Sequence, residues 1–431
     1  MLKMRKMKDS GIEWIGEIPE GWRTTNPKAL FTQRKDKAQK GERQLTSSQQ
    51  YGILYQDDYM ELTGSKVVTV EKDFDILKHV EAGDFVISMR SFQGGLEYST
   101  KSGAISSAYV MLVPNLELVY PRFYRWLLKS SVYIDALQRT TNMVRDGQAM
   151  RYSNFAQVRL FTLPLDEQKS RADFLDLECS SIDKILFKIR SSIEEYKKLK
   201  QAVITQAVTK GVRGEREMKD SGVEWIGEIP KEWGQTKVKM VASFFNGDRT
   251  SRYPQPTDFV DNGIAFLTSR NINGDEVDLS EVKYITESKY NNLSGAKIQI
   301  NDIVFCLRGS VGKCAINQTL SCGTVASSLA TIRPNRVHPK YLLYFLLSDV
   351  ASIQTAVFMN GTCAANLSAE NVANYYITLP ISAEQKEIAA YLDAKCAEID
   401  KLIAKKEQLV KELESYKKSL IYEVVTGKRE V

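Results

Sequence analysis

The sequence predicts an α+β protein with two α+β domains in tandem, each followed by a long helix. Three observations predict this fold class. One unit of about half of the 431 residues is repeated. The first part of each unit has short apolar runs that are typical of strands. The second part is a long stretch without Pro or Gly, in residues that favour helix. Length alone would indicate two to four domains.

The repeat is clearest at the start of each unit. Residues 7–22 read MKDSGIEWIGEIPEGW and residues 218–233 read MKDSGVEWIGEIPKEW, so only three of sixteen positions differ. Weaker matches follow in the same order, such as 83–90 with 301–308 and 163–169 with 379–386. The ends of the two units are alike and the middles differ. This pattern indicates a shared scaffold that carries two different recognition surfaces.

The first part of each unit predicts a small α+β domain. Strands are expected where apolar runs are bounded by turn residues: Lys66–Val70, Asp84–Ser88, Ala108–Val113, Ile303–Leu307 and Ala330–Arg333. A helix is expected over Pro121–Leu137 and over Pro339–Val357, each with Pro in its first turn.

The second part of each unit predicts a helix of about 44 residues, or roughly 65 Å. Heptad spacing places apolar side chains on one seam of each helix: Leu175, Ile182, Ile189, Tyr196, Val203, Leu392, Ile399, Leu413 and Leu420. Lys406 interrupts the seam, and Gly211 and Gly427 are expected to end the helices. Two such helices predict a coiled coil. A pseudo-two-fold axis through it would make them antiparallel, with the two α+β domains at opposite ends. The expected parts are 1–165, 166–211, 212–381 and 382–431.

Composition excludes several classes of protein. No apolar run approaches the roughly 18 residues of a membrane span, and residues 1–22 are polar. Six Cys without paired spacing argue against disulfides and against a metal site. These features predict a cytoplasmic protein. The net charge of +6 is mild, and nearly all of the excess lies in residues 1–165.

Catalytic motifs are absent from the sequence. It has no GxxxxGK[ST] loop, no GxGxxG after a strand, no HExxH and only two His. The acidic pair Asp166–Glu167 recurs as Ala383–Glu384 at a helix start, where acidic side chains favour the helix dipole. The sequence therefore predicts a recognition or scaffold protein rather than an enzyme.

Several features together resemble the specificity subunit of type I restriction-modification systems. They are Gly-Glu-Ile-Pro followed by Trp22 or Trp233, strands that end in Arg90 or Arg308, and Leu-Pro followed by Glu-Gln-Lys at the start of a long helix. The order of domain, helix, domain and helix covers essentially the whole chain.

The resemblance implies two target-recognition domains that each read half of a bipartite, asymmetric site in double-stranded DNA. The helices would then set the spacer between the half-sites. It also implies two methyltransferase subunits and two restriction or translocase subunits as partners. S-adenosylmethionine, ATP and Mg would be bound by those partners, so this chain would hold no cofactor and no metal. The alternative from the residues alone is a two-headed coiled-coil adaptor that binds protein and not DNA.

Candidate DNA contacts follow from side-chain chemistry, since Arg suits guanine and Asn or Gln suits adenine. Polar and basic segments between strands supply the candidates Arg34, Lys35, Lys37, Ser48, Gln49, Gln50, Tyr51, Arg90, Gln93, Arg249, Arg252, Ser269, Arg270, Asn271 and Arg308. Arg90 and Arg308 occupy equivalent repeat positions, which favours a shared contact to the DNA backbone. The paired Trp residues, Trp14 with Trp22 and Trp225 with Trp233, are expected to be packed anchors between domain and helix.

Overall fold

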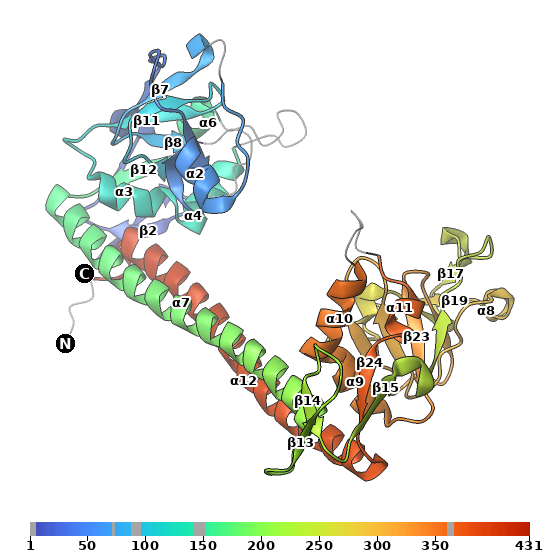
Figure 1. Ribbon diagram of the computed structural model, residues 1–431. Coiled ribbons are helices and arrows are strands. Elements are labelled where there is room, and N and C mark those ends of the chain that lie inside the picture. The colour runs from blue at the N-terminus through green and yellow to red at the C-terminus, as the bar shows by residue number, and fades with distance from the viewer. Residues whose placement is uncertain (1–5, 71–73, 88–95, 141–150, 360–365) are drawn as a thin grey trace. The chain divides into compact units, whose positions relative to one another are not determined.

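The computed structural model describes all residues except 1–5, 71–73, 88–95, 141–150 and 360–365 (Figure 1). The chain forms two compact units. Unit 1 contains Met1–Ile189 and Gln408–Val431, and unit 2 contains Arg190–Glu407. Each long helix therefore contributes one part to unit 1 and the other part to unit 2.

Unit 1 is built on a four-stranded antiparallel sheet in the order β4-β11-β8-β9. Its strands are β4 (Phe31–Arg34), β11 (Val110–Pro114), β8 (Phe85–Ile87) and β9 (Leu96–Tyr98). Four strand pairs accompany the sheet: β1 (Met7–Ile12) with β2 (Gly16–Pro19), β3 (Arg23–Thr25) with β12 (Leu160–Thr162), β5 (Leu45–Ser48) with β6 (Gly52–Tyr55), and β7 (Lys78–Val80) with β10 (Gly103–Ile105). The short helices are α1 (Pro27–Leu30), α2 (Gln56–Thr63), η1 (Phe74–Ile76), α3 (Pro121–Leu128), α4 (Ser131–Gln138) and α6 (Tyr152–Phe155).

Unit 2 repeats this sheet as β16-β23-β20-β21 and adds a second sheet, β17-β19-β18-β22. The strands of the two sheets are β16 (Ala242–Asn246), β23 (Leu329–Pro334), β20 (Ile303–Cys306), β21 (Cys314–Ile316), β17 (Phe259–Val260), β19 (Lys283–Ile285), β18 (Ile264–Leu267) and β22 (Gly323–Val325). The strand pairs are β13 (Met218–Asp220) with β14 (Glu228–Pro230) and β15 (Gly234–Lys237) with β24 (Tyr376–Leu379). The short helices are η2 (Val238–Met240), η3 (Pro256–Asp258), η4 (Ser269–Asn271), α8 (Glu287–Asn292), α9 (Pro339–Leu347), α10 (Asp349–Met359) and α11 (Ala369–Ala373).

The expected strand over Lys66–Val70 is wrong. These residues belong to no strand, and the side-chain amide of Gln44 instead bonds both backbone groups of Val70, at 2.8 and 2.9 Å. One amide side chain thus satisfies the backbone that a neighbouring strand would otherwise have paired. Val68 is 87% exposed, so its apolar side chain marks no buried face.

The two expected Pro-initiated helices are each broken in two. Ser130 separates α3 from α4, and Ser348 separates α9 from α10. Both serines are buried, and each hydroxyl donates to a carbonyl three residues earlier, on Leu127 or Phe345, at 2.7 and 2.6 Å. Because a serine side chain competes for helical carbonyls, it favours a break at this position.

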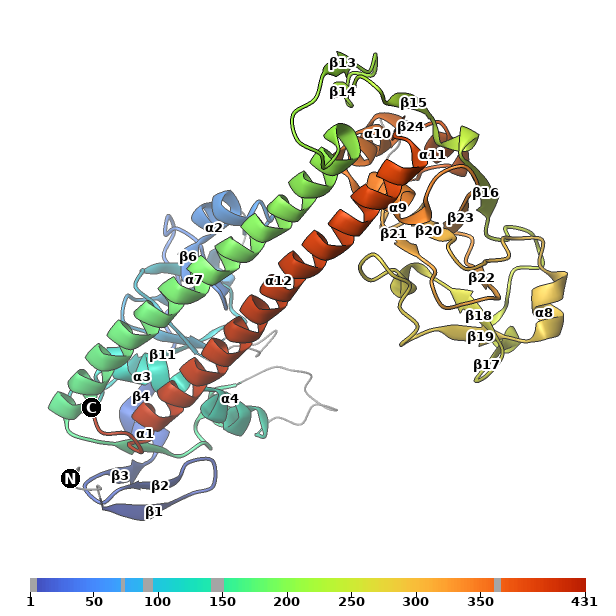
Figure 2. The ribbon, with the colours of Figure 1, turned by 90° about the horizontal axis from the view of Figure 1, so that it is seen from below.

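The two long helices are α7 (Leu165–Lys210) and α12 (Ser382–Val425), as the absence of Pro and Gly predicts. Inside each unit their parts run antiparallel (Figure 2). In unit 1, Arg171 donates to the Val424 carbonyl and Lys417 pairs with Asp183. In unit 2, Lys200 pairs with Asp400 and Arg213 with Glu387.

The heptad side chains lie along these contacts. All nine predicted seam residues are buried or half-buried. Lys406, which interrupts the seam in the sequence, places its ammonium 5.5 Å from the centre of the Tyr196 ring. A cation over an aromatic face is attractive, which explains how a lysine is accommodated there.

The first turn of each long helix holds its α+β domain through one Glu and one Gln. In unit 1, Trp22 is fully buried and its indole N–H donates to Glu167 at 3.1 Å. In unit 2, the indole N–H of Trp233 donates to Glu384 at 2.9 Å. The prediction that Trp22 and Trp233 are packed anchors is confirmed.

The neighbouring glutamines fix the start of helix α3 or α9. Gln168 is 0% exposed; its side-chain oxygen accepts from the Tyr120 N–H, and its NH₂ donates to Leu118 and Leu163. Gln385 is 3% exposed; it accepts from the His338 N–H at 2.8 Å and donates to the Pro380 carbonyl at 2.9 Å. Each amide satisfies buried backbone groups that would otherwise be unpaired.

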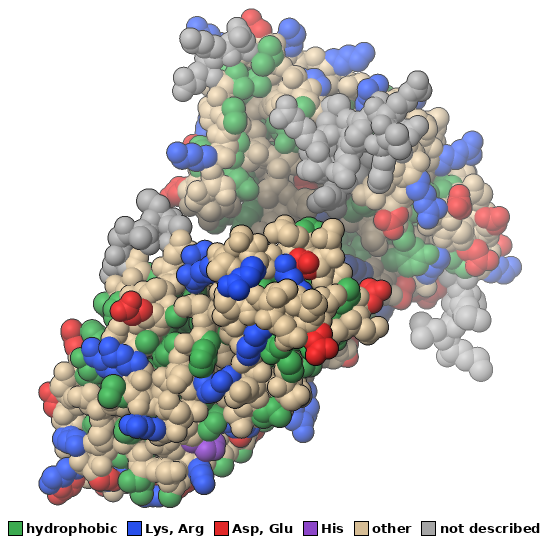
Figure 3. All heavy atoms as spheres, turned by 90° about the vertical axis from the view of Figure 1, so that its right-hand side faces the viewer, with side chains coloured by type: hydrophobic (Ala, Val, Ile, Leu, Met, Phe, Trp, Pro, Cys, Tyr) green, Lys and Arg blue, Asp and Glu red, His purple; other side chains and the backbone are tan. Residues whose placement is uncertain are grey.

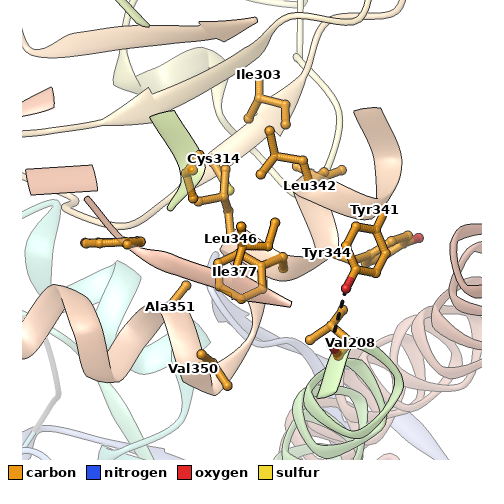
Figure 4. Close-up of a cluster of buried hydrophobic side chains, with 14 of the residues drawn as sticks. Val208, Ile303, Cys314, Tyr341, Leu342, Tyr344, Leu346, Val350, Ala351 and Ile377 are labelled. Carbon is orange, nitrogen blue, oxygen red and sulfur yellow. Dashed lines mark hydrogen bonds between the residues drawn. The ribbon is translucent and has the colours of Figure 1, made fainter. Parts of the chain in front are cut away.

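The core of unit 2 joins helix α9 to β24 and to α7 (Figure 4). The Tyr341 hydroxyl points to α7, where it lies 3.3 Å from the Val208 carbonyl. Six of the nine residues of α9 are buried. Within the described ranges no single helix has the length and apolar character to cross a membrane; the bent pair α9–α10 has them together, by length and composition only.

Replacing Gln385 with Leu should destabilise the protein by about 1–3 kcal/mol, because the His338 N–H and the Pro380 carbonyl would stay buried without partners. Urea unfolding followed by tryptophan fluorescence measures this change. The matched control is Gln408→Leu on exposed helix surface, where the effect should stay within about 0.5 kcal/mol. Equal effects from the two variants would contradict the role given to Gln385.

His79 fastens the segment after β4 to strand β7. Its ring nitrogens lie 3.0 Å from Glu42 and 3.0 Å from Glu81, and its backbone N–H donates to Asp36. Burial opposes the charge on His79, but the hydrogen bonds to Glu42 and Glu81 outweigh it, so the pKa of His79 is raised. A raised folded-state pKa contributes stability that is complete below the unfolded value and is lost as pH rises through the folded value.

The stability advantage of the wild type over His79→Gln should therefore shrink as pH rises from about 6 to about 9. Urea unfolding at a series of pH values measures it. His338→Gln is the control with the opposite sign, because burial and nearby lysines lower the pKa of His338. Its effect should change only below about pH 6.5. A pH-independent difference for His79→Gln would contradict the charged cluster.

Candidate nucleic-acid interface

In unit 2, four chain segments meet around the start of strand β23. Asn246, at the end of β16, pairs with Ala330, and Cys306, at the end of β20, pairs with Leu329. Strand β22 runs directly into β23, and β18 is parallel to β22. The segments that follow β16, β18, β20 and β22 therefore lie at one edge of the domain.

Printed hydrogen bonds connect these segments. The Ala326 N–H donates to the Leu267 carbonyl at 2.8 Å, and the Leu307 N–H donates to the Ser328 carbonyl at 2.9 Å. The Arg249 guanidinium donates to the Ser327 carbonyl at 3.3 Å. We define the unit 2 edge as residues 247–252, 268–271, 307–313 and 326–328.

The unit 2 edge is basic. It carries five exposed cationic side chains: Arg249, Arg252, Arg270, Arg308 and Lys313. Within the described ranges none of them forms an ion pair. Asp278 and Glu281 follow in the loop before β19, so the edge keeps a net positive charge. Unpaired cations at one edge attract a polyanion.

Asp248 holds the first segment of the edge in shape. Its carboxylate is 3% exposed and accepts from the N–H and hydroxyl of Thr250 and of Ser294, at 2.7–3.1 Å. Burial opposes ionisation of Asp248, but these four bonds outweigh it and hold its pKa well below its usual value. A Cβ on Gly247 would come within 2.2 Å of the Ala326 carbonyl oxygen, so only glycine fits this approach.

Beside Asp248 lies a hollow of about 400 Å³, lined in part by Phe245, Asn246 and Arg249. It belongs to the edge through the Asp248 segment. The basic side chains on the face seen in Figure 3 are spread between neutral and apolar surface and do not form one continuous patch. Charge at the edge is therefore local, which fits the mild total charge of the chain.

Two of the candidate residues are used inside the fold. Arg34 donates through two nitrogens to Asp84, at 2.7 and 3.0 Å, and through a third to Asp36. Asn271 is 1% exposed, and its amide bonds Thr268 and Asp278. The interface therefore leaves out Arg34 and Asn271 as direct contacts.

The corresponding edge of unit 1 is formed by the turns after β4, after β5 and between β10 and β11. Gln44 is paired in parallel with Ala104, as Phe266 is with Thr324. Ser48 in unit 1 and Arg270 in unit 2 each lie four residues further on, so they occupy equivalent positions. The two edges share a backbone plan and differ in side chains.

The remaining unit 1 candidates are placed at or near that edge. Ser48 is half-buried, and its hydroxyl accepts from the Tyr51 N–H at 3.4 Å. The exposed candidates are Lys35, Lys37, Gln49, Gln50 and Tyr51. Arg90 and Gln93 lie outside the described residues. In unit 2, Ser269 is half-buried at the start of η4.

A cleft of about 620 Å³ lies at the unit 1 edge, between β5 and the β10–β11 turn. Its polar lining includes Thr46, Ser47, Ser106 and Ser107, and Lys66 is its one charged residue. Hydroxyls and amides, rather than guanidinium groups, therefore dominate the described part of this edge.

Sequence reasoning missed Asp248, Lys313 and the β22–β23 turn. Lys313 follows Gly309 and Gly312, which both have positive φ and shape the β20–β21 turn. The signal available for Lys313 was its place in the turn after Arg308. No signal in the sequence indicated that the segment 326–328 lies between the other three, because this depends on the parallel pairing of β18 with β22.

Comparison with known proteins places this geometry in a family. Residues 230–412 match a family model described as "Type I restriction modification DNA specificity domain". The type I restriction enzyme MjaVIII specificity subunit of Methanocaldococcus jannaschii is 25% identical over 81% of this chain and 80% of its own length. The EcoBI specificity subunit of Escherichia coli is 25% identical over 63% of this chain and 58% of its own length.

A solved structure has the same fold. Its subject is complex assembly and conformational transition of the type I R-M system, and one of its chains superposes with a TM-score of 0.70 at 14% identity. The match covers 96% of this chain and 99% of the other. The resemblance carried by the sequence motifs is confirmed: this chain is a relative of the specificity subunits of type I restriction enzymes.

Proposed function

We propose that this chain recognises a bipartite, asymmetric site in double-stranded DNA and directs a type I restriction-modification complex to it. The observation that carries the proposal is the pair of edges built on one backbone plan with different side chains. A protein that reads two unlike half-sites needs this combination. The unpaired cations of the unit 2 edge supply contacts to phosphate, and its loops supply contacts to bases.

The two long helices set the spacer between the half-sites in this proposal. They act as an antiparallel coiled coil with pseudo-two-fold symmetry between two target-recognition domains. The antiparallel contacts found inside each unit support this arrangement. The seam is stabilised by heptad packing together with ion pairs such as Lys417–Asp183 and Lys200–Asp400.

The chemistry belongs to partners in this proposal. Two methyltransferase subunits and two restriction or translocase subunits assemble on the chain in the cytoplasm. They hold S-adenosylmethionine, ATP and Mg, and this chain supplies specificity. Across the described residues no cluster of three His, Cys, Asp or Glu side chains suits a metal ion.

Duplex DNA should bind to the chain assembled with its methyltransferase subunit, with affinity that falls steeply as salt rises, because bound phosphates release counterions. Electrophoretic shift over a salt series measures it. Methylome sequencing of cells that express both subunits should show one bipartite target. Assembly without any shift of duplex DNA would instead identify the chain as a protein-binding adaptor.

Deleting one heptad from both helices, at residues 188–194 and 406–412, should shorten the spacer of that target. Seven residues span about 10 Å, which is about three base pairs of DNA. Methylome sequencing measures the spacer directly. Deletion from one helix only is the control, and it should abolish assembly because the two seams lose register. A functional double deletion with the original spacer would refute the proposed role of the helices.

A further inference from the structure

We infer that unit 2 reads a guanine through Arg270, with Asn271 as the residue that positions it. The half-site recognised by unit 2 therefore contains a G·C pair at that position. The inference rests on the proposed function and names the base contact that this function requires.

Arg270 is presented by a rigid turn. It follows strand β18 in the one-turn helix η4, where its backbone N–H donates to the Thr268 hydroxyl at 3.4 Å. Its side chain is exposed and forms no ion pair with any described residue. A guanidinium on a fixed backbone loses little conformational entropy when it binds in one geometry.

Asn271 fixes this turn from inside the domain. Its side-chain oxygen accepts from the Thr268 N–H at 2.9 Å and hydroxyl at 3.2 Å, and its NH₂ donates to the Asp278 carbonyl at 3.0 Å. The backbone adds a bond from the Asp278 N–H to the Asn271 carbonyl at 2.8 Å. All of these bonds lie within one turn of the chain from Arg270.

Comparison of the two units separates Arg270 from the other arginines. Arg308 has Arg90 at its repeat position, so both units keep an arginine there, as a shared contact to phosphate requires. The position of Arg270 is Ser48 in unit 1. A residue that reads bases must differ between domains that read different half-sites, and Arg270 meets this condition.

The other two arginines of the edge are partly used by the protein. Arg249 donates to the Ser327 carbonyl, and Arg252 donates through Nε to the Thr250 hydroxyl at 3.4 Å. Arg270 keeps its whole donor fork free, and two parallel N–H donors match the O6 and N7 acceptors of guanine in the major groove.

The test is selection of bound duplexes from a randomised library by the chain assembled with its methyltransferase subunit. Wild type is compared with Arg270→Ser, which installs the unit 1 residue. The expected result is a G·C pair in one half-site that Arg270→Ser relaxes by roughly 10- to 100-fold in preference, with the other half-site unchanged. Asn271→Ala should relax the same position, and it should add nothing to that relaxation in the Arg270→Ser background.

Lys313→Ser is the matched control on the same edge. Its contact is to phosphate, so it should weaken binding equally for all sequences and reduce the salt slope by about one. The same uniform loss for Arg270→Ser would overturn the inference, as would relaxation at an A·T pair. If Asn271→Ala lowered all positions alike, its role would be structural and the positioning claim would fail. A wild-type complex that selects no bipartite site would overturn the proposed function and this inference with it.

Discussion

The rest of the structure depends on the Glu-Gln pair in the first turn of each long helix. The Glu binds a buried indole from the hairpin at the start of the unit, and the Gln binds the backbone at the start of α3 or α9. Two side chains on one helical turn thereby hold the first and last strands of a domain to the helix. This constraint explains why the ends of the repeat are alike, because both partners of each contact lie there. The edges face no such constraint and differ.

Acidic residues at equivalent positions keep their place while their arginine partners do not. Asp84 and Asp302 both precede the central strand of their sheet and are 1% exposed. Asp84 is paired by Arg34 of β4, and Asp302 by Arg333 of β23. Likewise Glu167 is bound by Arg171 of its own helix, and Glu384 by Arg216 beyond the end of α7. A long flexible arginine reaches a buried carboxylate from several strands, so the charge requirement is met from different sequence positions.

The sequence predicted the features that depend on periodicity and repetition. Helices α7 and α12, the buried Trp22 and Trp233, and the family all follow from repeated motifs. It did not predict the breaks at Ser130 and Ser348, because a single buried hydroxyl decides them. It also selected Arg34 and Asn271 as surface residues, since a side chain that pairs with a distant buried partner looks polar and available in one dimension. The edge itself depends on the parallel pairing of β18 with β22, which no local pattern indicates.

Unit 1 is discontinuous in the chain, and this has a consequence for its synthesis. The carbonyls of Val424 and Arg429 accept from Arg171, which is 1% exposed, and Leu420, Val424 and Val425 complete the same core. A ribosome therefore releases the N-terminal domain long before the segment that closes its core exists. During that interval the guanidinium of Arg171 and the surrounding apolar surface have no final partner. Unit 2, which is continuous, can mature first, and the last two dozen residues then complete the domain that was made first.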